Sequence, residues 1–359
     1  MPATLAPALM ANSLPSSDRL IALVDGMAGR PVAMVVDLVA DRFITGTPKR
    51  ISREAPVLIL SYEGERLAPG GGANAVANVA ALGGRPLPLG VVGDDASGRE
   101  LVAALGALGV ETDGILVRPG YRTPTKVRIL GGGRHAIKQQ IVRYDVEDHL
   151  ALGAGEREGF AARLGAWAAE LSGAAPVAVL SDYGYGAVEP ALLPCLRRAL
   201  GDGATILCDS RYRLGDFQGL DGATPNEEEA EALLGRRLPE DLPEAAAAGE
   251  TLRGRLGARF LLVTRGSRGM SLFAEGSAAH LPVHGTDQVA DVTGAGDTVI
   301  GTFALALAAG AAPLEAALLA DYAGGVVVMK MGTATLSADE LRHAVAGDPR
   351  PLAELQWAR

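Results

Sequence analysis

Short apolar runs rich in β-branched residues alternate along this chain with stretches rich in alanine and leucine. Strands buried on both faces of a sheet read as continuous apolar runs, and parallel neighbours need a long connection, usually a helix. The alternation therefore predicts parallel βαβ units with helices on both faces of one sheet. The strand candidates are Val32–Val36, Leu87–Val92, Val177–Ser181, Thr205–Cys208 and Phe260–Thr264, and the helix candidates are Ala73–Leu82, Gly98–Leu108, Pro190–Leu200 and Glu227–Leu234.

Two segments, residues 43–67 and 122–145, interrupt this alternation. Both space β-branched residues with polar ones, and the second has a turn at Gly131–Gly133, so we expect paired strands. A small sheet built from two separate segments would cover a cleft as a lid or pair with another copy of the chain. An ordinary edge hairpin is the alternative.

Together these patterns predict an α/β fold, a three-layer α/β/α sandwich with a mainly parallel central sheet and a small inserted β-sheet lid. A length of 359 residues allows two or three domains. We expect one domain over residues 18–345, a flexible tail at residues 1–17 and a C-terminal tail at residues 346–359.

Charge and cysteine content exclude several classes of protein. The formal net charge is −9, which argues against a nucleic-acid partner. The uncharged stretch Thr298–Leu314 is interrupted by Gly301, Gly310 and Pro313, so a buried helix explains it better than a membrane span. No positive region precedes the first apolar run, and the two cysteines form no CxxC pair. We therefore expect a reduced, cytoplasmic protein that binds neither membrane nor nucleic acid.

Glycine accounts for 47 of the 359 residues, nearly twice the roughly 7% of average proteins, and one cluster lies at Gly70–Gly72. Three successive glycines before a helix let a ligand approach the backbone closely, and the helix start supplies free N–H donors. Asn74, in the first turn, has the groups to bond a polyol. By itself, such a loop is as often structural as functional.

A second cluster, Gly294–Gly296, is followed by Asp297 and a long apolar helical stretch. Consecutive N–H groups at the positive end of a helix suit an anion such as a transferring phosphoryl group. A carboxylate there is an ordinary residue of a helix start. It is equally suited to take a proton from a hydroxyl that attacks phosphorus.

The two clusters carry a resemblance. PGGGANAVANVAALGG (residues 69–84) and DVTGAGD (residues 291–297) resemble the two signatures of the ribokinase-like, or PfkB, family of sugar kinases. Between them, TPNEEEAEALLG resembles the family's Asn-x-x-Glu motif and VTRGSRGM its nucleotide loop. The resemblance covers about residues 20–343. It implies a ribokinase-like fold and phosphorylation of a sugar hydroxyl that depends on ATP and Mg²⁺.

A finer resemblance is to the heptose-7-phosphate kinases of bacterial lipopolysaccharide-precursor synthesis. It is carried by DLVADRFITGTPKRISREAPV (residues 37–57), KQQIVRYDVED (138–148), SDYGYG (181–186) and VVVMKMGTATLS (326–337). The implied substrate is D-glycero-D-manno-heptose 7-phosphate, phosphorylated at its anomeric C1 hydroxyl. Some relatives carry a second, nucleotidyltransferase domain, and here we expect any such activity on another protein.

The resemblance assigns roles around the sugar. Asp297 would be the general base, and the N–H groups of Gly294, Ala295 and Gly296 would stabilise charge on the γ-phosphoryl group. A salt bridge within the lid is the alternative for Asp41, and a solvated strand face is the alternative for the lid cations. The sugar-contact candidates are Asp37, Asp41, Gly70, Gly71 and Asn74, and the lid cations expected to bind a substrate phosphate are Arg50, Lys126, Arg128 and Arg143.

The resemblance also implies nucleotide and metal sites. Asn226 and Glu229 would hold Mg²⁺ through water, although plain acidity at a helix start explains them too. Asp291 would help to order a loop that binds a monovalent cation such as K⁺. A tight strand-to-helix turn is the alternative for the nucleotide loop. The residues expected to contact ATP are Asn226, Thr264, Gly266, Ser267 and Gly269.

Some positions depart from the family pattern. Val36 stands where relatives usually have Gly, Tyr185 replaces the Lys expected in SDYGKG, and Asp321 takes a place near adenine where Asn is frequent. A kinase of a free hexose or pentose is therefore an alternative, as is a non-catalytic sugar-binding or nucleotide-binding regulator on the same fold. A nicotinamide dehydrogenase is set aside because no GxGxxG follows the first strand. We expect a homodimer through the lid, because two short β segments alone make a marginal sheet.

Overall fold

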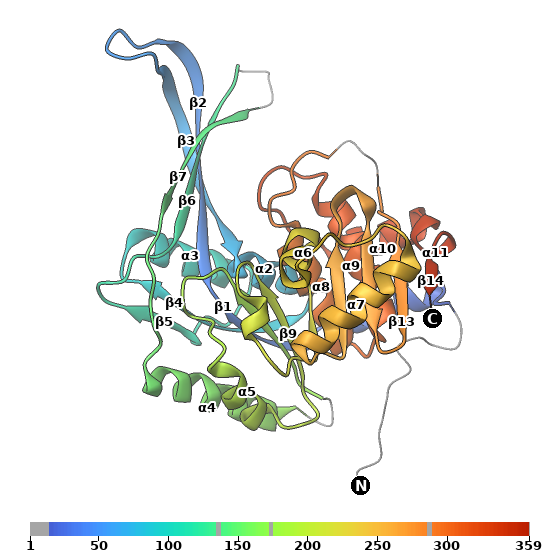
Figure 1. The fold of residues 1–359 in the computed structure, drawn as a ribbon. Coiled ribbons are helices and arrows are strands. Elements are labelled where there is room, and N and C mark those ends of the chain that lie inside the picture. The colour runs from blue at the N-terminus through green and yellow to red at the C-terminus, as the bar shows by residue number, and fades with distance from the viewer. Residues whose placement is uncertain (1–13, 134–137, 172–174, 286–288, 359) are drawn as a thin grey trace.

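The computed structural model describes residues 14–133, 138–171, 175–285 and 289–358 (Figure 1). The strands of its large sheet are β1 (Pro31–Val36), β4 (Arg85–Gly93), β5 (Ile115–Arg118), β8 (Val177–Asp182), β9 (Thr205–Ser210), β10 (Gly222–Ala223), β11 (Phe260–Thr264), β12 (Met270–Ala274), β13 (Ser277–Leu281) and β14 (Gln356–Ala358). Across the described residues their order is β14-β13-β12-β11-β10-β9-β8-β1-β4-β5. From β11 to β5 the strands run parallel, and β12, β13 and β14 add an antiparallel edge.

Helices cover both faces of this sheet. Alternate residues of a strand point to opposite faces, so Val32, Met34 and Val36 of β1 pack into one buried cluster and Ala33 and Val35 into the other. The predicted three-layer α/β/α sandwich is confirmed. The first face carries α1 (Ser17–Gly26), α2 (Gly72–Ala81), α3 (Ala96–Ala107), α8 (Ala295–Ala308), α9 (Pro313–Val327) and α10 (Ala338–Gly347), with α11 (Arg350–Ala353) behind them, and the second face carries α4 (Ala154–Glu170), α5 (Leu192–Leu200), α6 (Glu227–Leu234) and α7 (Leu242–Leu256).

A second sheet projects from the body as a long arm (Figure 1). Its strands, in the order β3-β2-β6-β7, are β2 (Leu38–Ile51), β3 (Leu58–Gly71), β6 (Thr125–Gly131) and β7 (Gln139–Val146). We call it the lid sheet. Its strands extend the two expected segments toward the body, because β2 starts directly after Asp37 and β3 runs into α2. The base of the lid sheet therefore lies where β1 ends and α2 begins.

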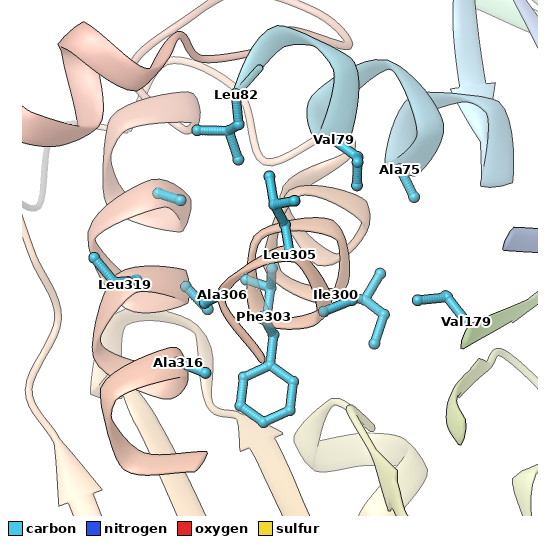
Figure 2. Packing of buried hydrophobic residues seen from close by; sticks show 14 of the residues in the cluster. Ala75, Val79, Leu82, Val179, Ile300, Phe303, Leu305, Ala306, Ala316 and Leu319 are labelled. Carbon is cyan, nitrogen blue, oxygen red and sulfur yellow. The ribbon is translucent and has the colours of Figure 1, made fainter. Parts of the chain in front are cut away.

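Helix α8 is buried from Asp297 to Ala306. In Figure 2, Ile300 points toward Val179 of β8, while Val79 of α2 and Leu319 of α9 flank the helix. Burying each large apolar side chain stabilises the fold by roughly 1.5–3 kcal/mol, so this packing fixes the helix firmly. The second glycine cluster is thereby held at a defined place beside α2.

The strand and helix candidates named from the sequence are confirmed, with ends that differ by a few residues. The uncharged stretch Thr298–Leu314 is not one helix, because Gly310 adopts a φ of +87° after α8 and Pro313 begins α9. The expected C-terminal tail differs as well: residues 356–358 form β14, which pairs with β13. A three-residue strand has no apolar period by which the sequence could reveal it. None of the helices among the described residues has the length and apolarity that a membrane crossing requires.

Candidate active site

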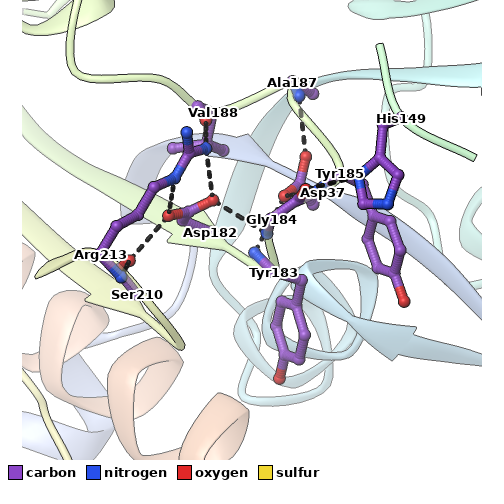
Figure 3. Close-up of polar contacts among 10 residues, drawn as sticks. All are labelled: Asp37, His149, Asp182, Tyr183, Gly184, Tyr185, Ala187, Val188, Ser210 and Arg213. Carbon is purple, nitrogen blue, oxygen red and sulfur yellow. Dashed lines mark hydrogen bonds and ion pairs between the residues drawn. The ribbon is translucent and has the colours of Figure 1, made fainter. Parts of the chain in front are cut away.

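A loop at the carboxyl ends of the central strands is held by two buried carboxylates (Figure 3). Asp37 follows β1 and Asp182 ends β8, at the point where the chain switches from one side of β1 to the other. Such switch points are where open α/β sheets bind ligands. The loop that begins at Tyr183 therefore lies at the centre of the candidate site.

Asp37 accepts three backbone hydrogen bonds from this loop. The N–H groups of Tyr183 and Tyr185 donate to Oδ2 at 2.9 Å each, and that of Ala187 donates to Oδ1 at 2.8 Å. Burial raises the pKa of Asp37 to about 6, although these donors oppose the rise. Both carboxylate oxygens thus hold the loop, which supports a structural role beside the predicted sugar contact.

Asp182 anchors the other end of the loop. Its Oδ2 accepts from Ser210 Oγ at 2.7 Å and from Arg213 Nε at 2.9 Å, and its Oδ1 accepts from the Gly184 N–H at 3.0 Å. Arg213 also donates to the Val188 carbonyl at 2.6 Å. A buried acid is tolerated here because a guanidinium and a hydroxyl pair with it.

The two glycine clusters meet through Asn74. Its Nδ2 donates to the Gly294 carbonyl at 3.2 Å and to Asp297 Oδ2 at 3.1 Å. Gly294 precedes α8 with a φ of +80°, and a Cβ there would lie 2.4 Å from Asn74 Nδ2. Only glycine fits this position, because the backbone angle and the space both exclude a side chain.

Asp297 lies in the first turn of α8 and is 2% exposed. The hydroxyl of Tyr183 donates to its Oδ1 at 2.7 Å, on the oxygen that Asn74 does not use. Burial raises the pKa of Asp297 to about 7, against the opposing effect of these two donors and of Lys126. A carboxylate with a pKa near neutrality has the strength of a base that can both take and release a proton.

Two adjoining cavities open beside Asp297. The smaller, of about 190 Å³, is lined by Asp297, Gly294 and Gly296 together with Asn226 and Glu229. The larger, of about 640 Å³, is lined by the four residues of the nucleotide loop that were predicted to contact ATP, Thr264, Gly266, Ser267 and Gly269, together with Ala295 and Gly296. Because Thr264 and Gly296 line both cavities, a ligand in the larger cavity can reach Asp297 and the second glycine cluster.

A family model described as pfkB family carbohydrate kinase matches residues 33–148 and 216–340. The chain belongs to the pfkB family of carbohydrate kinases. It is therefore a phosphotransferase that acts on a sugar hydroxyl, and membership implies ATP and Mg²⁺.

Curated relatives narrow the comparison. The chain is 39% identical over 350 residues to "Bifunctional protein HldE" of Mesorhizobium japonicum, covering 96% of this chain and 68% of that protein. It is 40% identical over 340 residues to the protein of the same name from a Caulobacter species, covering 92% and 67%. This pfkB-family chain thus spans about two thirds of these relatives.

Solved structures confirm the ribokinase-like fold. Escherichia coli phosphofructokinase-2 in complex with substrates and products superposes with a TM-score of 0.70 at 20% identity, covering 89% of this chain and 99% of that one. Arabidopsis thaliana ribokinase complexed with ribose and ATP gives 0.67 at 21% identity, covering 88% and 99%. At these identities, the likeness concerns the fold alone.

The predicted Mg²⁺ residues of this kinase cap a helix. Asn226 Oδ1 accepts from the Glu229 N–H, and Glu229 Oε2 accepts from the Asn226 N–H, both at 2.9 Å. Burial, with Glu229 and Asp297 nearby, raises the pKa of Asp209 well above its ordinary value in the same cavity. No group of three acidic, His or Cys side chains among the described residues is close enough to ligate a metal directly. The donor set fits Mg²⁺ that keeps its waters.

Strand alternation gives the lid sheet one charged face, which includes three of the four predicted cations. Arg128 Nη1 pairs with Asp41 Oδ1 at 2.5 Å, as the salt-bridge alternative for Asp41 anticipated, and Arg143 pairs with Asp145 at 2.9 Å. Lys126 has no acidic partner among the described residues and lies 5.3 Å from the Tyr183 ring centroid. Burial lowers the pKa of Lys126.

Arg50 does not join this cluster. It lies nine residues beyond Asp41 on β2, which corresponds to about 30 Å along an extended strand. Arg66 on β3 takes its place, with the guanidinium 4.1 Å from the Phe43 ring centroid. The sequence pattern did not identify Arg66, because only the register of β2 with β3 brings it beside Phe43.

The first glycine cluster packs against the lid and β1. A Cβ on Gly70 would lie 2.6 Å from Asp41 Cγ, and Gly71, with a φ of +52°, would clash with Val39. Val36, an exception to the family pattern, is buried with its Cβ 2.6 Å from where a Gly72 Cβ would be. In this chain, the absence of side chains at Gly70–Gly72 therefore leaves room for neighbouring protein side chains.

Three other predicted positions have defined surroundings. Asp291 accepts from the N–H groups of Thr293 and Gly332 at 2.9 Å each, and so ties together the two loops beside α8. Asp321 lines the larger cavity, and burial raises its pKa well above its ordinary value. The Tyr185 hydroxyl donates to Glu147 Oε1 at 3.4 Å, at the end of β7.

Sequence reasoning missed several residues of the smaller cavity, among them Tyr183, Asp209 and Arg211. Tyr183 directly follows β8, Arg211 directly follows β9, and Asp209 is the next-to-last residue of β9. This position at the carboxyl end of a central strand is the one signal that marks them. Their contacts with Asp297 and Glu229 cross more than 15 positions of sequence, so no local motif encodes them.

Proposed function

We propose that this kinase transfers the γ-phosphoryl group of ATP to the C1 hydroxyl of D-glycero-D-manno-heptose 7-phosphate. The observation that carries the proposal is the charged face of the lid sheet beside Asp297, where Lys126 remains without an acidic partner among the described residues. A sugar bound with its hydroxyl at Asp297 would present a distant phosphate to Lys126, Arg66 and Arg143. The chain's similarity to the two HldE proteins is in keeping with this proposal, which also draws on the sequence resemblance to heptose-7-phosphate kinases.

Asp297 and the second glycine cluster suit such a transfer. Asp297 would take the proton of the acceptor hydroxyl as its oxygen attacks the γ-phosphorus, and the bond to the β-phosphate oxygen would break. The N–H groups of Gly294, Ala295 and Gly296 would bind the negative charge that develops on the transferred group. The larger cavity would hold the nucleoside, and a cytoplasmic location fits an enzyme that consumes ATP.

Asn226 and Glu229, with Asp209 facing them, would hold Mg²⁺ through its waters. When bound, the ion neutralises charge on the phosphoryl oxygens. Asp291 would order a monovalent cation loop through its bonds to Thr293 and Gly332. A solved structure of Escherichia coli phosphofructokinase-2 is described as a complex with potassium, which is in keeping with this assignment.

Phosphorylation of a free hexose or pentose is the second candidate. Tyr185 favours it, because the residue replaces an expected cation and its side chain is bonded to Glu147. A non-catalytic regulator is less well supported, since a binding protein needs no base beside its anion site.

A coupled ADP-release screen with phosphorylated and free sugars tests the substrate. We expect heptose 7-phosphate to give the highest kcat/KM. Lys126→Met, which keeps the apolar stem, should raise KM for the phosphosugar by about 10–100-fold through loss of one charged contact, and should change KM for free heptose much less. Lys49→Met, an exposed lysine of β2, is the matched control. Preference for a free sugar would overturn the phosphate assignment and favour the second candidate.

We further propose a homodimer that forms through the other face of the lid sheet. Six large apolar side chains on its strands are exposed: Ile51, Leu58, Tyr62, Ile141, Val142 and Tyr144. Part of this surface is hollowed, with about 310 Å³ between Ile44, Leu60 and Val142. A second copy would bury this face against its own equivalent, as a two-fold dimer requires, and would remove an exposed apolar patch.

Light scattering at micromolar concentration is expected to give the mass of two chains. Val142→Asp should give the mass of one chain, because two carboxylates would face each other in the buried interface. Val117→Asp, at an equally exposed valine on β5, should stay dimeric. A wild-type mass of one chain would contradict this arrangement.

A further inference from the structure

Tyr183 connects the catalytic carboxylate to the scaffold of the loop. We propose that Tyr183 is a positioning residue for phosphoryl transfer. Its phenol holds the Asp297 carboxylate in the orientation that proton transfer requires, and it also helps to set the strength of that carboxylate as a base. This inference rests on the proposed role of Asp297. It concerns a residue of the SDYGYG segment that neither the glycine clusters nor the nucleotide loop explains.

Tyr183 is fixed from both ends. Its backbone N–H donates to Asp37 at 2.9 Å, and its hydroxyl donates to Asp297 at 2.7 Å. Figure 3 shows the ring pointing away from Asp37, with the hydroxyl at the far end. The Tyr183 ring therefore links the Asp297 carboxylate to the loop that Asp37 holds in place.

Neighbouring groups restrict the position of the Tyr183 ring. A Cβ on Gly71 would lie 3.3 Å from Tyr183 Cδ2, so only the bare backbone of that glycine allows the ring to lie there. On another side, Lys126 Nζ lies 5.3 Å from the ring centroid, within range of a cation–π contact. The lid sheet and the first glycine cluster therefore both help to place the phenol.

The two donors divide the carboxylate between them. Tyr183 takes Oδ1 and Asn74 takes Oδ2, so the group cannot rotate without breaking a bond. Each oxygen keeps a second lone pair, and one of these can receive the proton of the acceptor hydroxyl. Because both bonds are made to the ionised form, they favour the deprotonated state that a base needs.

The charges that face Asp297 come from several elements. Asp41 of β2 raises the pKa of Asp297, whereas Lys126 of β6 lowers it. Asp209 of β9 also faces it across the smaller cavity. Burial, with Asp297 and Asp209 nearby, raises the pKa of Tyr183 well above its ordinary value, so the phenol remains a donor throughout the working range. Without the Tyr183 donor, the rise that burial causes in the pKa of Asp297 is opposed less strongly. The Asp297 carboxylate then keeps its proton up to a higher pH.

The test is the pH dependence of kcat/KM, measured by ADP release from the full chain with ATP, Mg²⁺ and the best sugar of the screen. For Tyr183→Phe we expect the acid limb of the profile, where kcat/KM falls as the pH is lowered, to move to higher pH by about one unit. This is the size expected for the loss of one hydrogen bond to a charged acceptor. The loss of rate should be largest below pH 7 and largely recovered at pH 9. Tyr185→Phe, two residues along the same loop, removes a hydroxyl bonded to Glu147 and should leave the acid limb in place.

A fluorinated tyrosine at position 183 supplies a second variant that keeps the ring and its packing. Its more acidic phenol is a stronger donor and should move the acid limb the opposite way, to lower pH. An unchanged acid limb in both variants would overturn the inference, as would an equal loss of rate at every pH in Tyr183→Phe. Asp297→Asn separates the role of Asp297 from that of Tyr183. If this variant retains turnover, the general-base role of Asp297 is refuted. If it loses turnover while the pH profile of Tyr183→Phe is unshifted, only the role of Tyr183 is refuted.

Discussion

Replacing Asp297 by asparagine is expected to lower kcat by about 10²–10⁴, the usual contribution of a general base, while KM for ATP and sugar changes little. The amide keeps the size of the side chain and can still accept from Tyr183, but it cannot take a proton. In the wild type, the rate should fall below pH 7, because the pKa of Asp297 is raised to about 7 and only the ionised form acts. Steady-state kinetics from pH 5.5 to 9 measures both effects, and near-wild-type turnover in the variant would refute the assignment.

The same substitution should change stability in a pH-dependent way. Burial raises the pKa of Asp297 in the folded chain above the ordinary value of 3.8. The stabilising contribution of the protonated form is therefore complete below pH 3.8 and is lost as pH rises to about 7. Relative to Asp297→Asn, the wild type should lose about 2–3 kcal/mol of unfolding free energy between pH 5 and 7. Urea titrations at these pH values measure it, and parallel curves for the two proteins would contradict the raised pKa.

Local signals in the sequence were sufficient to predict the strands and helices of the scaffold. The parallel strands are continuous apolar runs because both of their faces are covered, and β1 divides its side chains between the two buried clusters as a period of two demands. The glycines at 70–72 and 294–296 were recognisable because bare backbone before a helix has few other uses. That Asn74 joins the two clusters is a contact across 220 positions, which no motif contains.

The candidate site was less accessible to sequence reasoning, for reasons of distance and pairing. Arg50 and Arg128 are both lid cations by pattern, yet one lies near the far end of β2 and the other pairs with Asp41. Only strand register decides which cations of the lid sheet lie close to Asp297. Tyr183 could not be singled out either, because its importance arises from two contacts, with Asp37 and Asp297, that follow from the topology.

Asp37→Ala is expected to destabilise the protein by about 3–5 kcal/mol and to abolish most activity. The substitution leaves the N–H groups of Tyr183, Tyr185 and Ala187 without their acceptor, and each buried donor that loses its partner costs about 1–3 kcal/mol. The loop would then loosen and withdraw the Tyr183 hydroxyl from Asp297. Urea unfolding measures the first effect, and kcat of the residual folded protein measures the second.

Asp94→Ala is the matched control, because Asp94 also follows a parallel strand directly but is exposed, and its ion pair is with Arg99 on the surface. Its substitution should change the unfolding free energy by less than about 0.5 kcal/mol. The milder Asp37→Asn distinguishes the two roles of Asp37. If the carboxylate mainly holds the loop, the amide lowers both stability and kcat, because its NH₂ group faces a backbone donor. If it mainly contacts the sugar, as the family resemblance implies, the amide raises KM and leaves the unfolding free energy unchanged.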